Sequence, residues 1–280
     1  MSIGAVDRCL DLLELLADRS EGMELVSIAA HLTIPVSATH RLLATLVDRG
    51  FVKQEPLSQI YSLSVRLAQL GFRYLDCSVL PDAAMTVLES LAKRTGDYCR
   101  LAVVEGDDLV WVARAQGATS GLRYDPDMGQ IIVLHATATG KAWLSMLSEN
   151  DALRIVFTRG FESHLRMGPN VVRNIDELRS HLEQTRDRGY AVAVEEGEIG
   201  TCAIAVPFRT SNETDALVAG TLSVAGPTGR LKPERYPEIV EALKVAALEM
   251  QDIWSVRKRQ VRQSAEYTVR ATSIGSKAIA

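Results

Sequence analysis

The segment from Glu24 to Gly50 constrains the fold of this chain more than any other. It contains a short helical pattern, "ELVSIAAHL", then "TIP", and then a second helical pattern, "VSATHRLLATLVDRG". The proline has no N–H to donate and restrains the residue before it, so it separates the two helices. Apolar residues recur at helical spacing in both, and Gly50 is a natural C-terminal stop. This pattern predicts a helix-turn-helix.

The outer side of the second helix carries small polar residues at its start and an arginine one turn later. This arrangement suits an approach to base edges and phosphates. The following stretch, "FVKQEPLSQIYSLS", predicts two short strands around a turn, which form a wing. We include Thr39 among the candidates, although its spacing also places it on the buried stripe. The candidate DNA-binding residues are Ser27, Ser37, Ala38, Thr39, His40, Arg41, Thr45, Arg49 and Lys53.

The charge of the chain limits this interpretation without excluding it. A formal net charge of -4 argues against a protein that coats nucleic acid non-specifically. Between residues 27 and 73, however, five basic residues stand against two acidic ones. A positive phosphate-facing side is therefore compatible with the sequence. The alternative is a helical hairpin that only packs or dimerises.

The rest of the chain divides into segments that differ in composition and in the spacing of their apolar residues. A first amphipathic helix, "AVDRCLDLLELLAD", completes a winged helix-turn-helix domain over residues 1–64, and a linker helix follows over 65–80. Strand-like stretches rich in Val, Ala and Ile then alternate with helical ones, which predicts an α+β domain over 81–255. The last residues, 256–280, are polar and basic without an apolar period, so we expect a flexible tail.

Several classes of protein are disfavoured. No apolar run approaches the ~20 residues that span a bilayer, and the N-terminus has the pattern of a helix, not of a signal peptide. The four cysteines are scattered and lack histidines at ligand spacing, so we expect no disulfide framework, no metal site and a cytoplasmic location. The Gly140–Lys141 pair is not a Walker A loop, because His135 and Ala142 replace its first glycine and its hydroxyl residue.

Four stretches, in order and at matching spacing, resemble the IclR family of transcriptional regulators. They are "IPVSATHRLLATLVDRGFV", "LHATATGKAWLSML", "GYAVAVEEGEIGTCAIAVPF" and "LSVAGP". The resemblance runs from Ala5 to about Trp254. It implies a GAF-like C-terminal domain, an antiparallel sheet flanked by helices, without catalytic activity or cofactor, which responds to a small-molecule effector.

The resemblance also implies where the effector binds. Ala138 and Thr139 would offer backbone N–H groups at a helix start, where a carboxylate is favoured. Gly140 would let helix and sheet approach closely, while Lys141 would lay its stem over the core with a solvated head. Cys202 would line the pocket, and Ser223 would donate a hydroxyl bond. The apolar wall would consist of Leu122, Tyr124, Met128 and Ile132.

The sequence departs from the family at three positions. Ala193 and Ala225 stand where well-understood members with small polar acid ligands carry an aspartate and a second serine. Because polar atoms are costly to bury without partners, we expect an aromatic or branched carboxylate in place of a small oxoacid. Val36 stands where many relatives carry a basic residue, which removes one expected phosphate contact.

An enzyme is the less favoured alternative. Cys202 and His135 would be a nucleophile and base, and Glu195 and Glu196 a carboxylate pair. We expect the two glutamates to point to opposite faces of a strand, and Cys202 to be a buried small hydrophobe. We also expect His135 to be a structural histidine with its hydrogen bonds satisfied.

The sequence therefore predicts a regulator that binds double-stranded operator DNA under the control of a small organic acid, as a homodimer or homotetramer without membrane contact. The alternative function is a metabolite-binding sensor or scaffold that never contacts DNA. The choice between repressor and activator stays open.

Overall fold

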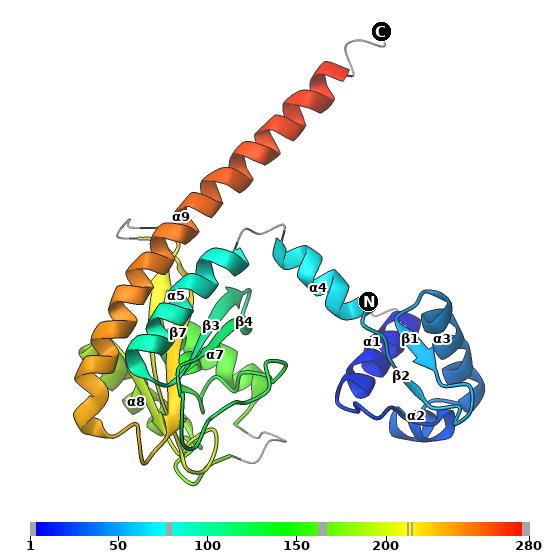
Figure 1. The fold of residues 1–280 in the computed structure, drawn as a ribbon, viewed down its shortest axis with the longest axis horizontal. Helices are drawn as coiled ribbons and strands as arrows, with labels where there is room; N and C mark the ends of the chain where they lie inside the picture. The colour runs from blue at the N-terminus through cyan, green and yellow to red at the C-terminus, as the bar shows by residue number, and fades with distance from the viewer. Residues whose placement is uncertain (1–3, 77–79, 162–166, 212, 214, 276–280) are drawn as a thin grey trace. The chain divides into compact units, whose positions relative to one another are not determined.

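The structure is a computed structural model that describes residues 4–76, 80–161, 167–211, 213 and 215–275. The chain divides into two compact units, Met1–Cys77 and Ser78–Ala280. Figure 1 shows the elements of both units in chain order.

The N-terminal unit is a winged helix-turn-helix, as the sequence predicts. Three helices precede a two-stranded antiparallel wing in which Lys53 lies opposite Ser62, and a fourth helix follows. Pro35 precedes the third helix directly, and Thr33 adopts a left-handed φ of 54° in the turn before it. The elements are α1 Gly4–Ala17, α2 Leu25–His31, α3 Val36–Asp48, β1 Val52–Gln54, β2 Tyr61–Leu63 and α4 Arg66–Asp76.

A small apolar core fixes α3 on the rest of this unit. Leu43 and Leu46 on α3 pack with Leu12, Leu16 and Ile28 from the first two helices. Because the inner face of α3 is bound in this way, its opposite face is available to a ligand. The expected linker helix is α4, although residues 77–79 of its predicted span lie outside the described part of the chain.

The C-terminal unit is α+β, as predicted. Its five strands form an antiparallel sheet in the order β4-β3-β7-β6-β5. Arg100 on β3 pairs with Ser223 on β7, which in turn pairs with Ala205 on β6, so these three residues form one row across the sheet. The strands are β3 Tyr98–Glu105, β4 Asp108–Gln116, β5 Ala191–Val194, β6 Thr201–Arg209 and β7 Val218–Pro227.

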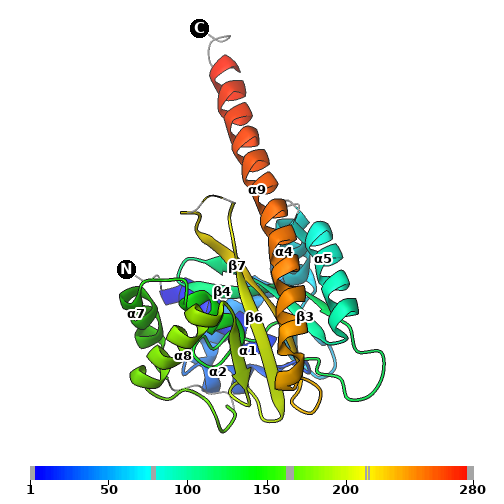
Figure 2. The same ribbon diagram turned by 90° about the vertical axis from the view of Figure 1, so that its left-hand side faces the viewer.

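Helices cover both faces of this sheet. One face packs against α5 and α9 and buries the largest apolar cluster, while α6 and α8 lie over the other face (Figure 2). Small residues dominate the face under α6, because alanines of β5 and β6 meet Ala138 and Ala142 there. The helices are α5 Leu80–Thr95, α6 Ala138–Leu144, α7 Glu149–Arg159, α8 Ile175–Arg188 and α9 Tyr236–Gly275, with a short 3-10 turn at Pro233–Arg235.

The last helix is longer than the sequence analysis anticipated. We expected a helix to about Trp254 and a flexible tail over 256–280, but α9 continues to Gly275. Between these two residues the chain contains no proline or glycine, and its four arginines, like its lysine, favour helix. We predicted a flexible tail because apolar residues do not recur there at helical spacing. Such spacing indicates that a helix packs against a core, and its absence does not show that a helix is absent.

Candidate functional site

The outer face of α3 carries most of the predicted DNA-binding residues. Arg41 and Thr45 lie one turn apart on it, and the Thr45 hydroxyl donates to the carbonyl of Arg41 at 2.9 Å. Lys53 extends the same set onto the first strand of the wing. The exposed members of the set are Ser27, Ser37, His40, Arg41, Thr45, Arg49 and Lys53, while Ala38 is half-buried.

Thr39 is the exception and corrects the prediction. Its side chain is fully buried, and its hydroxyl donates to the carbonyl of Pro35 at 3.2 Å. The hydroxyl therefore closes the first turn of α3, and the buried side chain lies on the inner face of the helix, away from the proposed DNA-binding face. Val36, where a basic residue is common in the family, is 45% exposed at the helix start, so this edge of the surface is apolar.

A cavity of about 100 Å³ lies in the C-terminal unit between the sheet and the start of α6. Its polar lining includes Ser223 and Thr201, and its apolar lining includes Trp111, Ala193 and Ala225. Both alanines noted as departures from the family therefore border the cavity, which makes its wall less polar. The predicted effector residues that line it are Ala138, Thr139, Cys202, Ser223, Tyr124 and Ile132.

Two of the predicted wall residues do not line this cavity. Leu122 is 73% exposed, in the connection between β4 and α6. Met128 packs against a second apolar cluster, where its sulfur lies 3.9 Å from the Tyr98 hydroxyl. Both lie in a long connection without regular structure, so no periodicity indicated which way their side chains turn.

Cys202 borders the cavity, but its thiol turns the other way. The Sγ atom lies 3.4 Å from the Tyr236 hydroxyl, among the core residues between the sheet and α9. Its neighbours Thr201 and Ala203 take the cavity side, as the alternation of a strand requires. Burial raises the pKa of the Cys202 thiol, which fits a buried small hydrophobe and not a nucleophile.

The sequence analysis missed the most unusual residue of the cavity, Arg100. This arginine is only 8% exposed, and its guanidinium lies 3.8 Å from the centre of the Trp111 ring. In the described part of the chain it forms no ion pair, and its Nε has no hydrogen-bond partner. A lone arginine inside the apolar strand "YCRLAVV" was the available signal.

Tyr124 and Glu198 border the cavity near this arginine. Burial lowers the pKa of Arg100, while Tyr124 counteracts that shift. Burial also raises the pKa of Tyr124, and a hydrogen bond with Glu198 raises it further. The cavity thus presents a buried cation, a neutral phenol and, at its exposed edge, one carboxylate.

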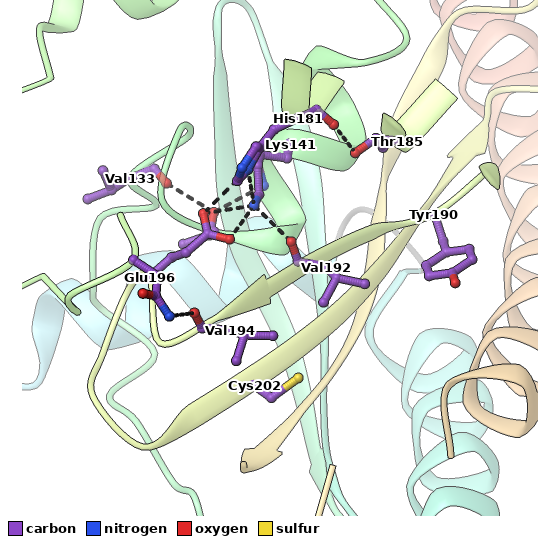
Figure 3. Close-up of polar contacts among 12 residues, drawn as sticks. Val133, Lys141, His181, Thr185, Tyr190, Val192, Val194, Glu196 and Cys202 are labelled. Atoms are coloured by element: carbon purple, nitrogen blue, oxygen red, sulfur yellow. Dashed lines mark hydrogen bonds and ion pairs between the residues drawn. The ribbon is translucent and has the colours of Figure 1, made fainter. Parts of the chain in front are cut away.

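A buried ion pair lies behind the cavity (Figure 3). The Nζ atom of Lys141 contacts both Glu196 oxygens, at 2.6 and 2.8 Å, and donates to the Val192 carbonyl at 2.8 Å. His181 Nδ1 lies 3.2 Å from the same Nζ. Lys141 is 1% exposed, so the expected solvated head is wrong. The sequence around Lys141 does not indicate its ion-pair partner, because Glu196 lies 55 residues further along the chain.

The same ion pair connects two parts of the cavity wall. Lys141 lies one turn beyond Ala138 and Thr139 on α6, and Glu196 directly precedes the lining residue Gly197. Burial lowers the pKa of Lys141 and raises that of Glu196, whereas their mutual attraction opposes both shifts. Both carboxylate oxygens and a carbonyl surround the ammonium group, and this arrangement favours the ionised form of the pair.

The start of α6 agrees in part with the prediction. Thr137 accepts a hydrogen bond from the Gly140 N–H at 3.0 Å and so caps the helix. A Cβ atom at Gly140 would collide with the backbone of Leu134, so the close approach made by this glycine is to the preceding turn. Ala138 and Thr139 lie beside the cavity, but α6 has only 7 residues, so its dipole is small.

The residues of the enzyme alternative do not converge. Glu195 and Glu196 lie after β5, in the connection to β6, and not in a strand as expected. Glu195 accepts from the Gly200 N–H, whereas Glu196 binds Lys141. His135 is buried, but its Nε2 has no partner in the described structure, contrary to the satisfied histidine we expected.

Among the residues that the structure describes, no group of three or more His, Cys, Asp or Glu residues is arranged to hold a metal ion. No helix in the described ranges is long and apolar enough to cross a membrane.

Comparison with known proteins identifies the class of this chain. The model of the bacterial transcriptional regulator IclR C-terminal domain matches residues 72–252, and that of the IclR helix-turn-helix domain matches residues 5–56. Together the two matches span most of the chain, in the order of the two structural units. The chain therefore belongs to the IclR family of transcriptional regulators, and it is a regulator and not an enzyme.

Individual relatives agree with this assignment. The chain is 31% identical over 249 residues to the HTH-type transcriptional regulator BhcR of Paracoccus denitrificans, covering 89% of this chain and 86% of that protein. It is 27% identical over 246 residues to the regulator XynR of Escherichia coli, covering 88% and 95%.

Solved structures show the same fold. An IclR transcriptional regulator from Alicyclobacillus acidocaldarius matches with a TM-score of 0.75 and 28% identity, covering 91% of this chain and all of that one. An IclR homologue from Microbacterium hydrocarbonoxydans, solved in complex with 4-hydroxybenzoate, matches with a TM-score of 0.69 and 22% identity, covering 90% and 99%.

Proposed function

We propose that this regulator binds operator DNA through α3 and the wing, and that a small organic acid in the cavity of the C-terminal unit controls this binding. The observation that carries the proposal is the cavity itself. Six residues selected from the sequence as effector contacts, on β6, β7, the start of α6 and the connection before α6, border one space. Such a space with a few polar groups in an apolar wall is the usual form of a small-molecule site.

The dimensions of the cavity restrict its ligand. At about 100 Å³ it is smaller than the cavity of about 150 Å³ that is known to hold benzene. A branched aliphatic acid therefore fits without rearrangement, whereas an aromatic acid requires the wall to move outward. The 4-hydroxybenzoate complex of the Microbacterium relative supports an aromatic acid as the second candidate.

The DNA-binding face is proposed from exposure and charge. Arg41, Arg49 and Lys53 are exposed on α3, its C-terminal end and the wing. We assign phosphate contacts to the basic residues and base-edge contacts to the small polar ones at the start of α3. We further propose that the protein works in the cytoplasm. We also propose that it forms a homodimer or homotetramer, because apolar surface is exposed on α1 and α4 at Val6, Leu10, Phe72 and Tyr74.

Operator binding is tested by fluorescence anisotropy on DNA selected from a random pool by the purified protein. We expect Arg41→Glu to abolish binding, and Lys53→Gln to weaken it on all sequences and reduce the salt slope by about 1. Arg19→Glu, a charge reversal at an exposed arginine after α1, is the matched control. Wild-type affinity in Arg41→Glu would refute the assignment to α3. Failure of the wild type to select any DNA would favour a sensor or scaffold.

Effector binding is tested by thermal shift against small branched and aromatic acids, since a bound ligand stabilises the folded state. We expect Ser223→Ala to weaken binding, because the Ser223 hydroxyl lies in the cavity wall. An unchanged dissociation constant in this variant, and in Ala225→Leu, which fills the cavity, would place the ligand elsewhere.

A further inference from the structure

We propose that Arg100 is the receptor for the carboxylate of the effector, and that the cavity selects acids with a single carboxylate. This inference rests on the proposed function of the cavity and adds the group that recognises the ligand. It starts from an incomplete set of contacts within the chain.

A buried guanidinium without a counter-ion is costly. Transfer of an ionised group from water to a protein interior is unfavourable unless the group is paired and hydrogen-bonded. Arg100 lies over the Trp111 ring and 5.5 Å from the centre of the Tyr98 ring. A hydrogen bond with Tyr124 and the charge of Glu198, at the exposed edge of the cavity, also favour the charged form of Arg100. In the described structure its Nε remains without a partner. Because Arg100 forms no ion pair among the described residues, we assign the missing partner to an anion on the ligand.

Arg100 lines the cavity, so an anion bound in the cavity can pair with it. Arg100 and Trp111 both line it, and Arg100 lies directly beside Ser223 on the neighbouring strand. A guanidinium is planar, and contact with the Trp111 ring restricts its movement, which suits the bidentate recognition of a carboxylate. One ligand carboxylate can thus accept from Arg100 and from the Ser223 hydroxyl together.

Glu198 restricts the remainder of the ligand. It borders the same cavity and hydrogen-bonds with Tyr124, so negative charge already lies at the exposed edge. A second carboxylate on the ligand would be repelled there, whereas a hydroxyl or ammonium group would find an acceptor. The ligand class is therefore a monocarboxylic acid with an apolar body and, at its far end, a hydrogen-bond donor.

The experiment uses isothermal titration calorimetry with matched neutral probes. Isobutyrate is compared with isobutyramide, and benzoate with benzamide, on the wild type, Arg100→Gln, Arg100→Lys and Arg114→Gln. Arg114 is the control, because it lies opposite Arg100 on β4 but is exposed, paired with Asp125 and outside the cavity. Circular dichroism checks that each variant is folded.

We expect the wild type and Arg114→Gln to bind the acids at least about 10-fold more tightly than the amides, which corresponds to one charge-assisted contact. Arg100→Gln should lose this preference, and Arg100→Lys should retain part of it. Glu198→Gln should improve the binding of terephthalate relative to 4-hydroxybenzoate. Equal binding of acids and amides by the wild type, or an intact preference in Arg100→Gln, would overturn the role of Arg100.

The operator response separates this inference from the proposed function. If acids bind through Arg100 but leave operator affinity unchanged, the carboxylate site stands and its regulatory role is wrong. If acids alter operator affinity equally in Arg100→Gln and the wild type, the regulatory role stands and the carboxylate site is wrong.

Discussion

Lys141 and Arg100 are both buried cations beside the cavity, but among the described residues only Lys141 forms an ion pair. Lys141 is held by Glu196, a carbonyl and a histidine, whereas Arg100 has aromatic neighbours and an Nε without a partner among the described residues. This difference separates a charged residue with a structural role from one that can bind a ligand. A buried charge with an internal partner fixes the fold, whereas one without a partner is available to a ligand.

The largest effect should follow from breaking the internal pair. Lys141→Met leaves the Glu196 carboxylate buried without its cation, and we expect the free energy of unfolding to fall by about 3–5 kcal/mol. Urea denaturation measures this loss. The double variant Lys141→Met/Glu196→Leu should recover most of it, because two apolar side chains can replace a buried ion pair. A single variant within about 1 kcal/mol of wild type would mean that the pair contributes little.

Replacing Arg100 with methionine should change the free energy of unfolding less than Lys141→Met does, and in the opposite direction. Arg100→Met removes a buried charge without an ion pair and two cation–π contacts, so we expect the ligand-free protein to keep its stability or gain up to about 1 kcal/mol. Thermal and urea unfolding without ligand test this comparison. A loss above about 2 kcal/mol would show that the guanidinium is a structural element, like Lys141.

The smallest effect concerns pH. Burial, and then the charge of Lys141, lower the pKa of His135 below the ordinary value of 6.5. The unfolded chain therefore binds this proton more readily, so stability is complete above the ordinary pKa and declines as pH falls below it. His135→Gln should flatten this dependence in urea titrations, whereas the exposed residue His31 provides a neutral control as His31→Gln. Identical slopes in wild type and His135→Gln would contradict the assignment.

The sequence predicted those features that repeat along the chain. Helical spacing and the proline at residue 35 located α2 and α3, and strand-like stretches rich in Val and Ala located β3 and β4. Thr39 was assigned to both faces of α3 at once, and the structure places it in the core. Helical spacing alone cannot show whether a residue at the edge of the apolar face is buried or exposed.

The long-range pairs were not predictable in the same way. Lys141 and Glu196 meet because α6 packs on the sheet near the end of β5, and no local pattern encodes that contact. The wall residues Leu122 and Met128 were misplaced because they lie between β4 and α6 without strand or helix periodicity. Arg100, in contrast, was visible as a single charge within an apolar strand, and its burial supplied the remaining argument.

The most direct test of the account is a crystal structure of the protein with a bound monocarboxylic acid such as isobutyrate. We predict a carboxylate oxygen at about 2.7–2.9 Å from a guanidinium nitrogen of Arg100, with the apolar body of the acid against Trp111 and the alanines of the wall. An acid bound elsewhere, with Arg100 still stacked on Trp111 and without an anion, would contradict it.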